Sequence, residues 1–118
     1  MKFMCMVYLS EAELFKLTPE ELKKLDIDSL AHDRGLAASG HYVTSQALQS
    51  VKTARCVRHQ GKGEYLVTDG PFVETKEQFG GFILVEAKDQ DEALALCMKI
   101  PVARFGGVEV RPIYEMQG

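Results

Sequence analysis

The chain has 118 residues, of which 46% are hydrophobic and 26% are charged, and its formal net charge is −3. This composition is typical of one soluble domain, here residues 1–118, and the acidic balance argues against a nucleic-acid binder. No apolar run approaches the roughly 20 residues that a membrane-spanning helix needs, so no membrane partner is expected. The three cysteines have no paired spacing, which predicts reduced thiols and a cytoplasmic location.

The first part of the chain predicts a strand followed by a long helix. Residues 3–9 are apolar on both alternations, so both faces of this strand need to be covered. After a polar connection, Thr18 is the expected N-cap of a helix, with Pro19 at its first position and Glu21 completing a capping box. The helix is expected to end near Ser39-Gly40. Its inward face carries residues three and four positions apart: Leu22, Leu25, Ser29, His32 and Leu36.

The middle of the chain predicts strands rather than helices. Residues 41–48 indicate a short strand, and residues 51–59 and 64–68 indicate a hairpin that turns through Gln60-Gly61-Lys62-Gly63. Residues 81–87 form a continuous apolar run, which is typical of a central strand.

The last part predicts a second helix and a closing strand. Asp89 is the expected N-cap, and Pro101 ends the helix. Residues 108–114 then form a strand. The buried stripe of the helix is expected to contain Ala93, Leu96, Cys97 and Ile100.

This order of elements predicts an α+β fold. It fits a ferredoxin-like βαββ(β)αβ antiparallel sheet with two helices on one face. Because two helices cover one face only, the other face of the apolar first strand would be exposed. We therefore expect a homodimer in which two such sheets pack face to face and enclose a space for a small molecule.

The connection from Thr68 to Gly81 is the first candidate for function because it is longer than a hairpin requires. Asp69 is a candidate general base or ligand acceptor at the end of a strand, or alternatively a turn cap followed by Phe72 as a core plug. Lys76 could hold an anion, and Glu74 or Glu77 could exchange a proton, or all three belong to a solvated loop. Gly80 and Gly81 are expected to allow a close backbone approach.

Three further residues are candidates for binding. In the last strand, Val108 and Val110 are expected to meet the helices, which turns Glu109 and Arg111 toward the space between the sheets. His32, at the edge of the helix stripe, is either a half-buried structural histidine or a site residue. The histidines and cysteines have no ligand spacing, so neither a metal nor another cofactor is expected.

Several segments together resemble the DGPF branch of the YCII-related family: residues 1–4, 67–82, 91–93, 101–104 and 108–112, with Asp69-Gly70-Pro71-Phe72 at their centre. The resemblance implies a ferredoxin-like fold paired into a dimeric α/β barrel. Some members of this branch accompany extracytoplasmic-function sigma factors. The His–Asp pair proposed for the narrower YCII group has no counterpart, because Ile100 precedes Pro101 and the first helix starts without a histidine.

The sequence leaves open whether the protein is an enzyme. One hypothesis is cofactor-free acid/base chemistry on a small anionic compound, with Asp69, Lys76 and Glu77 as catalytic groups. Glu74, Glu109, Arg111 and His32 would then bind the substrate. The alternatives are a non-catalytic ligand-binding or dimerisation module beside a sigma factor, and a structural clasp that locks the dimer.

Overall fold

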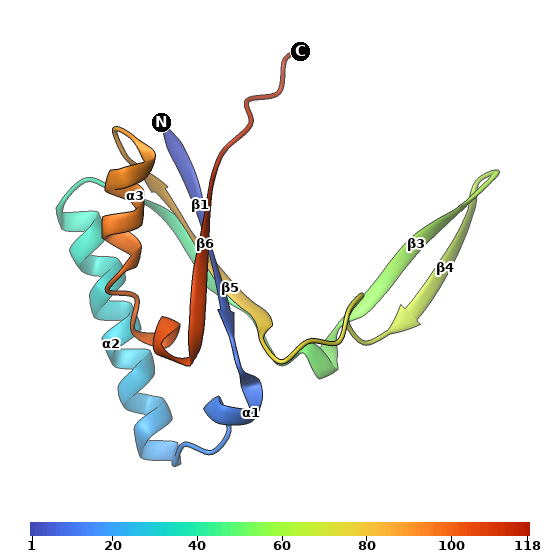
Figure 1. The fold of residues 1–118 in the computed structure, drawn as a ribbon, viewed down its shortest axis with the longest axis horizontal. Helices are drawn as coiled ribbons and strands as arrows, with labels where there is room; N and C mark the ends of the chain where they lie inside the picture. Colours follow the sequence, from blue (N-terminus) through green and yellow to red (C-terminus); the bar gives the residue numbers. More distant parts are fainter.

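One antiparallel sheet of four strands forms the centre of the computed structural model, which describes residues 1–118 (Figure 1). Its strand order is β2-β5-β1-β6, the ferredoxin-like order, and all neighbours are antiparallel. The sheet confirms the predicted α+β fold. Its strands are β1 (Lys2–Leu9), β2 (Tyr42–Ala47), β5 (Gln78–Glu86) and β6 (Gly106–Pro112).

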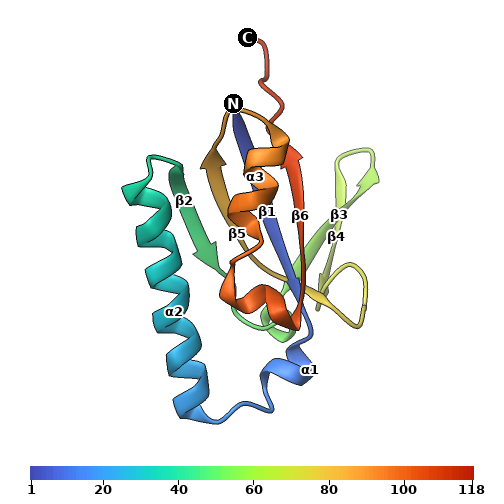
Figure 2. The ribbon, with the colours of Figure 1, turned by 60° about the vertical axis from the view of Figure 1, so that its left-hand side comes forward.

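Two helices, α2 (Pro19–Ala38) and α3 (Gln90–Cys97), lie on the same face of this sheet (Figures 1 and 2). The start of α2 is the predicted capping box. The Glu21 amide donates to Thr18 Oγ1 (3.1 Å), and the Thr18 amide donates to Glu21 Oε1 (2.9 Å). Asp89 caps α3 as predicted, because its Oδ1 accepts from the Glu92 amide at 2.9 Å. None of the helices is long and apolar enough to span a membrane.

The hydrophobic core lies between these helices and the sheet. Alternate residues of β1, from Phe3 to Leu9, are buried in it, whereas the residues between them are only half-buried. Val108 and Val110 pair with Val7 and Cys5 and pack against this core, so the predicted orientation of β6 is confirmed.

Two of the three free cysteines meet inside this core. The Cys97 thiol donates a hydrogen bond to Cys5 Sγ at 2.7 Å. This hydrogen bond, and then burial, raise the pKa of Cys97.

The opposite face of the sheet has no helix over it, and we call it the open face. In the register of the central strands, Met4 pairs with Leu84 and Met6 with Phe82. Tyr8 contacts Phe79 at the end of the same face, with ring centroids 5.5 Å apart. The sequence prediction that one apolar face lacks a helix is therefore confirmed within a single chain.

The predicted hairpin is also confirmed, but it does not join the main sheet. Strands β3 (Arg55–Gly61) and β4 (Glu64–Asp69) form a two-stranded sheet of their own, which we call the arm. It leaves the body on the side of the open face, away from α2 and α3 (Figures 1 and 2). Its tip turns through Gly61, Lys62 and Gly63, all at positive φ, which glycine adopts most readily.

Several element boundaries differ from the prediction for local reasons. Ser10 Oγ accepts from the Glu13 amide and so starts a single helical turn, α1 (Glu11–Leu14), which was not predicted. Val51–Thr53 is a 3₁₀ turn, η1, capped by Ser50, rather than the beginning of β3. A second 3₁₀ segment, η2 (Pro101–Phe105), follows α3.

The last strand and the proposed core plug also differ from the prediction. Strand β6 ends at Pro112, and Tyr114 is 81% exposed beyond it. Phe72 is 59% exposed, so the prediction that it plugs the core is wrong. Its ring instead lies 4.5 Å from the Arg58 guanidinium, at the base of the arm.

Candidate functional site

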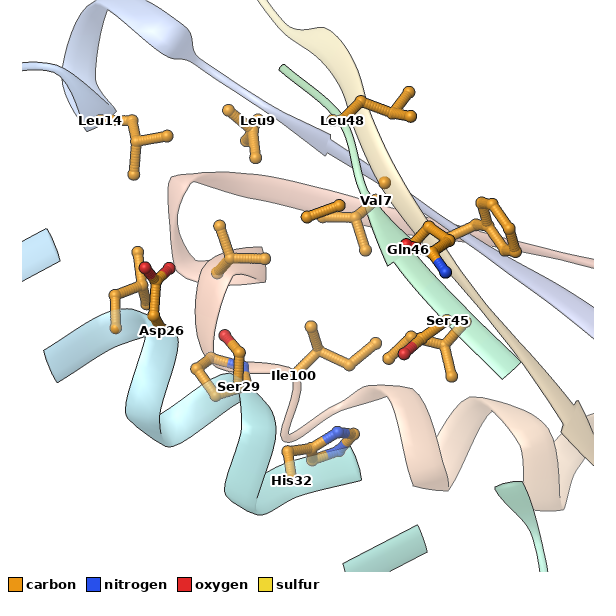
Figure 3. Close-up of a pocket in the computed structure, with 18 of the residues that line it drawn as sticks. Val7, Leu9, Leu14, Asp26, Ser29, His32, Ser45, Gln46, Leu48 and Ile100 are labelled. Carbon is orange, nitrogen blue, oxygen red and sulfur yellow. The ribbon is translucent and has the colours of Figure 1, made fainter. Parts of the chain in front are cut away.

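An apolar pocket of about 690 Å³ lies between α2 and the helix-covered side of the sheet (Figure 3). The volume is within the range of small-molecule sites, which is about 300–1,000 Å³. Val7, Leu9 and Ile83 line it from the sheet, Leu25 lines it from α2, and Ile100 follows α3. Most of these apolar residues also belong to the hydrophobic core.

A row of polar side chains on α2 faces this pocket. Asp26, Ser29 and Asp33 are three and four residues apart, which places them on one side of the helix, and His32 lies beside them. Ser45 and Gln46 contribute polar groups from β2 (Figure 3). No lysine or arginine lines the pocket, so it contains no fixed positive charge for an anionic ligand.

His32 is held at one ring nitrogen and unpaired at the other. Its Nε2 lies 3.2 Å from the Leu96 carbonyl oxygen, which can only accept, so Nε2 carries the proton. Nδ1 is then an acceptor in the neutral ring, and it is buried without a hydrogen-bond partner. An unsatisfied buried acceptor costs about 1–3 kcal/mol, and the large majority of buried polar groups in native proteins have a partner.

A chain of hydrogen bonds joins β2 to α2 along the pocket. Ser45 Oγ donates to Asp33 Oδ2 at 2.8 Å, so the Tyr42 hydroxyl donates to Ser45 Oγ, also at 2.8 Å. Because Tyr42 also packs against the core, this chain fixes the edge strand relative to the helix. The rim of the pocket is thus set by polar contacts as well as by packing.

Glu11 ties the pocket to the two connections of the arm. Its carboxylate accepts from Ser50 Oγ (2.7 Å) and from the Val51 amide (3.0 Å), just before the arm begins. Its own amide donates to Gln78 Oε1 at 2.9 Å, where the chain returns to the sheet. Glu11 also lines the pocket, so one residue contacts the site and both ends of this excursion.

Asp69 lies at the end of β4, on the arm and not at the pocket. Its side chain is 89% exposed and pairs with Arg55, with 3.1 Å between Oδ1 and Nε. An exposed pair of this kind contributes little to stability. The next residue, Gly70, has a φ of 87°, and its amide donates to the Ala54 carbonyl at 2.7 Å, which closes the base of the arm.

The other predicted loop residues lie near a second hollow. Lys76 and Glu77 line this hollow of about 1130 Å³ together with Tyr8 and Phe79, whereas Glu74 does not. All three charged side chains are exposed. The three charged side chains of this loop therefore face solvent and do not line the pocket beside α2.

Glu109 and Arg111 lie on the open face, as the register of β6 requires. They pair with Met6 and Met4, and their side chains approach each other to 4.0 Å. The structure therefore places the seven predicted site residues in four locations: the arm, the following loop, the open face and the α2 pocket. Only His32 belongs to the pocket.

Sequence reasoning missed most of the remaining polar groups of the pocket, among them Glu11, Asp26, Asp33 and Ser45. One signal was present, because Ser29 and His32 interrupt the apolar stripe of α2 at adjacent inward positions. No group of three or more histidine, cysteine or acidic residues lies close enough to hold a metal ion.

Comparison with known proteins agrees with this architecture. The YCII-related domain matches residues 1–117. Uncharacterized protein R00369 from Rhizobium meliloti (strain 1021) is 33% identical over 115 residues, which cover 96% of this chain and 92% of that protein.

A solved structure has the same fold at low sequence identity. It is 5-chloro-2-hydroxyhydroquinone dehydrochlorinase (TftG) from Burkholderia phenoliruptrix AC1100, in complex with 2,5-dihydroxybenzoquinone. The TM-score is 0.58 and the identity 15%, with 98% of this chain and 96% of that chain covered. The family match over nearly the whole length shows that the chain belongs to the YCII-related family.

Proposed function

We propose that the pocket beside α2 binds a small, neutral, ring-shaped molecule that carries hydroxyl groups. The observation that carries this proposal is His32 Nδ1, a buried acceptor without a partner on the lining of an apolar cavity. Because this nitrogen has almost no accessible surface, a ligand hydroxyl could donate to Nδ1 only after the surrounding side chains move, and it would then remove the cost of leaving this nitrogen unpaired. The neighbouring hydroxyl and carboxylate groups of α2 and β2 would orient further polar atoms of the ligand.

The lack of positive charge decides the ligand class. A carboxylate placed in this cavity would lose its hydration and meet acidic side chains instead of a cation. The proposal therefore differs from the sequence expectation of an anionic substrate, which was based on Lys76. A ring compound is also consistent with the fold, because TftG has been solved with 2,5-dihydroxybenzoquinone bound.

The same geometry supports proton transfer. The Leu96 carbonyl holds the ring of His32 in one tautomer, so Nδ1 can accept a proton from a bound hydroxyl without any cofactor. We therefore propose His32 as a general base, with simple ligand binding as the alternative. Turnover of a stabilising ligand, followed by its ultraviolet spectrum, separates the two, because His32→Gln would lower kcat only in an enzyme.

The test of binding is ligand-induced thermal stabilisation. Hydroquinone and 4-hydroxybenzoate differ at one position, where a carboxylate replaces a hydroxyl, and form a matched pair. At 100 times its Kd, a ligand stabilises by about 2.7 kcal/mol, so we expect hydroquinone, or another neutral phenol of a panel, to raise Tm. We expect no shift with 4-hydroxybenzoate, and none with any compound in His32→Leu.

A matched control uses another histidine. His41→Leu, at a histidine that does not line the pocket, should keep the ligand-induced shift measured relative to its own unliganded Tm. An equal shift in His32→Leu and wild type would refute the role of His32. A panel of neutral ring compounds without any effect would refute the assigned ligand class.

The residues of the loop after the arm remain a separate proposal. Lys76 and Glu77 line the second hollow, which supports the idea that an anion binds there. Asp69, Glu74, Glu109 and Arg111 would contribute only if a second copy brought them near it. Lys76→Ala should then abolish any stabilisation by an inorganic anion such as phosphate, and its failure to do so would remove this site.

We also infer that the protein is a homodimer whose open faces pack together. The chain exposes 8628 Å², whereas a compact monomer of its mass exposes about 6,400 Å². The excess of about 2,200 Å² is comparable to what one partner buries in a large obligate dimer. Packing two open faces against each other would bury their apolar side chains and so remove part of this excess surface.

A further inference from the structure

The arm extends away from the rest of its own chain (Figure 1). The radius of gyration is 16.3 Å, whereas a compact chain of this length has about 13.5 Å. Strands β3 and β4 pair only with each other, and every residue of β4 is exposed. An isolated two-stranded hairpin is marginally stable in water, so the arm needs a surface to rest on.

One side of the arm is apolar along its middle. The register pairs Val57 with Val67 and His59 with Tyr65, and paired residues project to the same side of a hairpin. The rings of His59 and Tyr65 are 4.6 Å apart, and both valines are 53% exposed. These side chains form a strip of two valines and two stacked rings along the arm, bounded at its base by the Arg55–Asp69 ion pair.

The direction of the arm shows which surface this strip can reach. The arm extends on the side of the open face, away from α2 and α3 (Figure 1). Packed sheets are about 10 Å apart, and a seven-residue strand is about 23 Å long. A second sheet seated on the open face would therefore lie on the same side as the arm, and the arm is long enough to extend past it along the body of that second molecule.

We propose that the arm of each copy clasps the second copy of the dimer, with the strip of Val57, Val67, His59 and Tyr65 against the partner. This inference rests on the proposed dimer and goes beyond it, because it assigns the arm and not only the open face to the interface. A second copy is the occupant that fits, because one two-fold axis covers both open faces and both arms. The excess surface of about 2,200 Å² per chain is large enough to include both contacts.

The first experiment locates the contact directly. A photoactivatable phenylalanine derivative is placed at Tyr65, and chains with and without a mass tag are mixed and irradiated. We expect cross-links between tagged and untagged chains, with the partner peptide identified by mass spectrometry. The same photoactivatable derivative placed at Ile27, which is exposed on α2, should give no cross-link between chains. Cross-links confined to one chain would overturn the proposal.

The second experiment measures the strength of the clasp. The double variant Val57→Ser/Val67→Ser should raise the dimer dissociation constant at least tenfold in sedimentation equilibrium. Ile27→Ser removes a side chain with the same exposed fraction, 53%, and should leave the constant unchanged. Far-ultraviolet circular dichroism confirms that each variant is folded.

The outcomes separate the two ideas. A dimer whose dissociation constant is unaffected by the double variant would refute the clasp and leave the sheet-to-sheet dimer standing. A wild-type chain that sediments as a monomer of 13.2 kDa at micromolar concentration would refute both. Neither result would bear on the ligand pocket, which lies within one chain.

Discussion

Two adjacent glycines in β5 provide the sharpest test of how the pocket is built. A Cβ added at Gly81 would lie 2.7 Å from the Gln46 carbonyl oxygen, a backbone atom of the neighbouring strand β2. Ordinary contacts between carbon and a carbonyl oxygen are about 3.3 Å or longer, so β2 would have to move by about half an ångström. Overpacking of this kind costs about 1–3 kcal/mol, partly offset by about 0.4–1 kcal/mol from the less flexible unfolded chain.

Gly80→Ala meets a side chain instead of the backbone. Its Cβ would lie 2.8 Å from Leu9 Cδ2, and Leu9 borders the pocket. The Leu9 side chain can rotate into the pocket at a cost of about 0.5–1.5 kcal/mol. This cost is similar to the gain from the less flexible unfolded chain, so the net change in stability should be near zero. The displaced methyl groups would occupy part of the pocket, and we expect ligand affinity to fall by roughly tenfold or more.

The two substitutions should therefore have crossed effects. For a chain of this length, about 1 kcal/mol corresponds to about 4 °C in Tm, so Gly81→Ala should lower Tm by about 4–8 °C. Gly80→Ala should keep its Tm within about 2 °C and lose about half of the ligand-induced shift or more. Both are measured by circular dichroism at one protein concentration, with and without a neutral phenol. Equal losses of stability in the two variants, or full ligand binding by Gly80→Ala, would refute this account.

Three further predictions concern the frame around the site. Gly35 lies in α2, and no atom is near the methyl group that Gly35→Ala would add. This substitution should stabilise the protein by about 0.5–1 kcal/mol and raise Tm by about 2–4 °C. A lower Tm would contradict an unobstructed helix position. The backbone amide of Thr18, and then its side chain, lower the pKa of Glu21 below its usual 4.5. The Glu21 carboxylate contributes fully to the free energy of unfolding above pH 4.5, and this contribution is lost as pH falls through the lowered pKa. In urea titrations, the difference in stability between wild type and Glu21→Gln should therefore shrink below pH 4.5. Iodoacetamide should modify Cys56 first, since the other two thiols are buried, and mass spectrometry showing three equal rates in the folded protein would contradict the described core.

The fold could be predicted because local signals and the covering of apolar surface agreed. The capping residues Thr18 and Asp89 defined two helix starts, and alternation along β1 indicated a face without a helix. Gly81 was expected to allow a close backbone approach, and this is confirmed by its contact with Gln46. The prediction failed for α1, because a single turn capped by Ser10 has too few residues to show a periodicity.

The site was harder to predict because its residues are brought together by tertiary structure alone. Asp33 and Ser45 lie 12 residues apart on different elements, and no spacing rule connects a helix to an edge strand in this way. The loop around Asp69 attracted attention through its composition, but its backbone role in closing the arm explains Gly70 without a ligand. Only His32 could be found from the sequence, as a polar interruption of an apolar stripe.

The contacts of Glu11 couple the pocket to the arm. Its carboxylate contacts the entry to the arm, its amide contacts the exit, and its side chain lines the pocket. A ligand that draws this carboxylate toward itself would loosen the anchorage of the arm, and a partner that holds the arm would in turn restrain Glu11. By thermodynamic linkage the two effects are equal in size, so in the proposed dimer a ligand that weakens the contact between subunits must itself bind more tightly to separated chains.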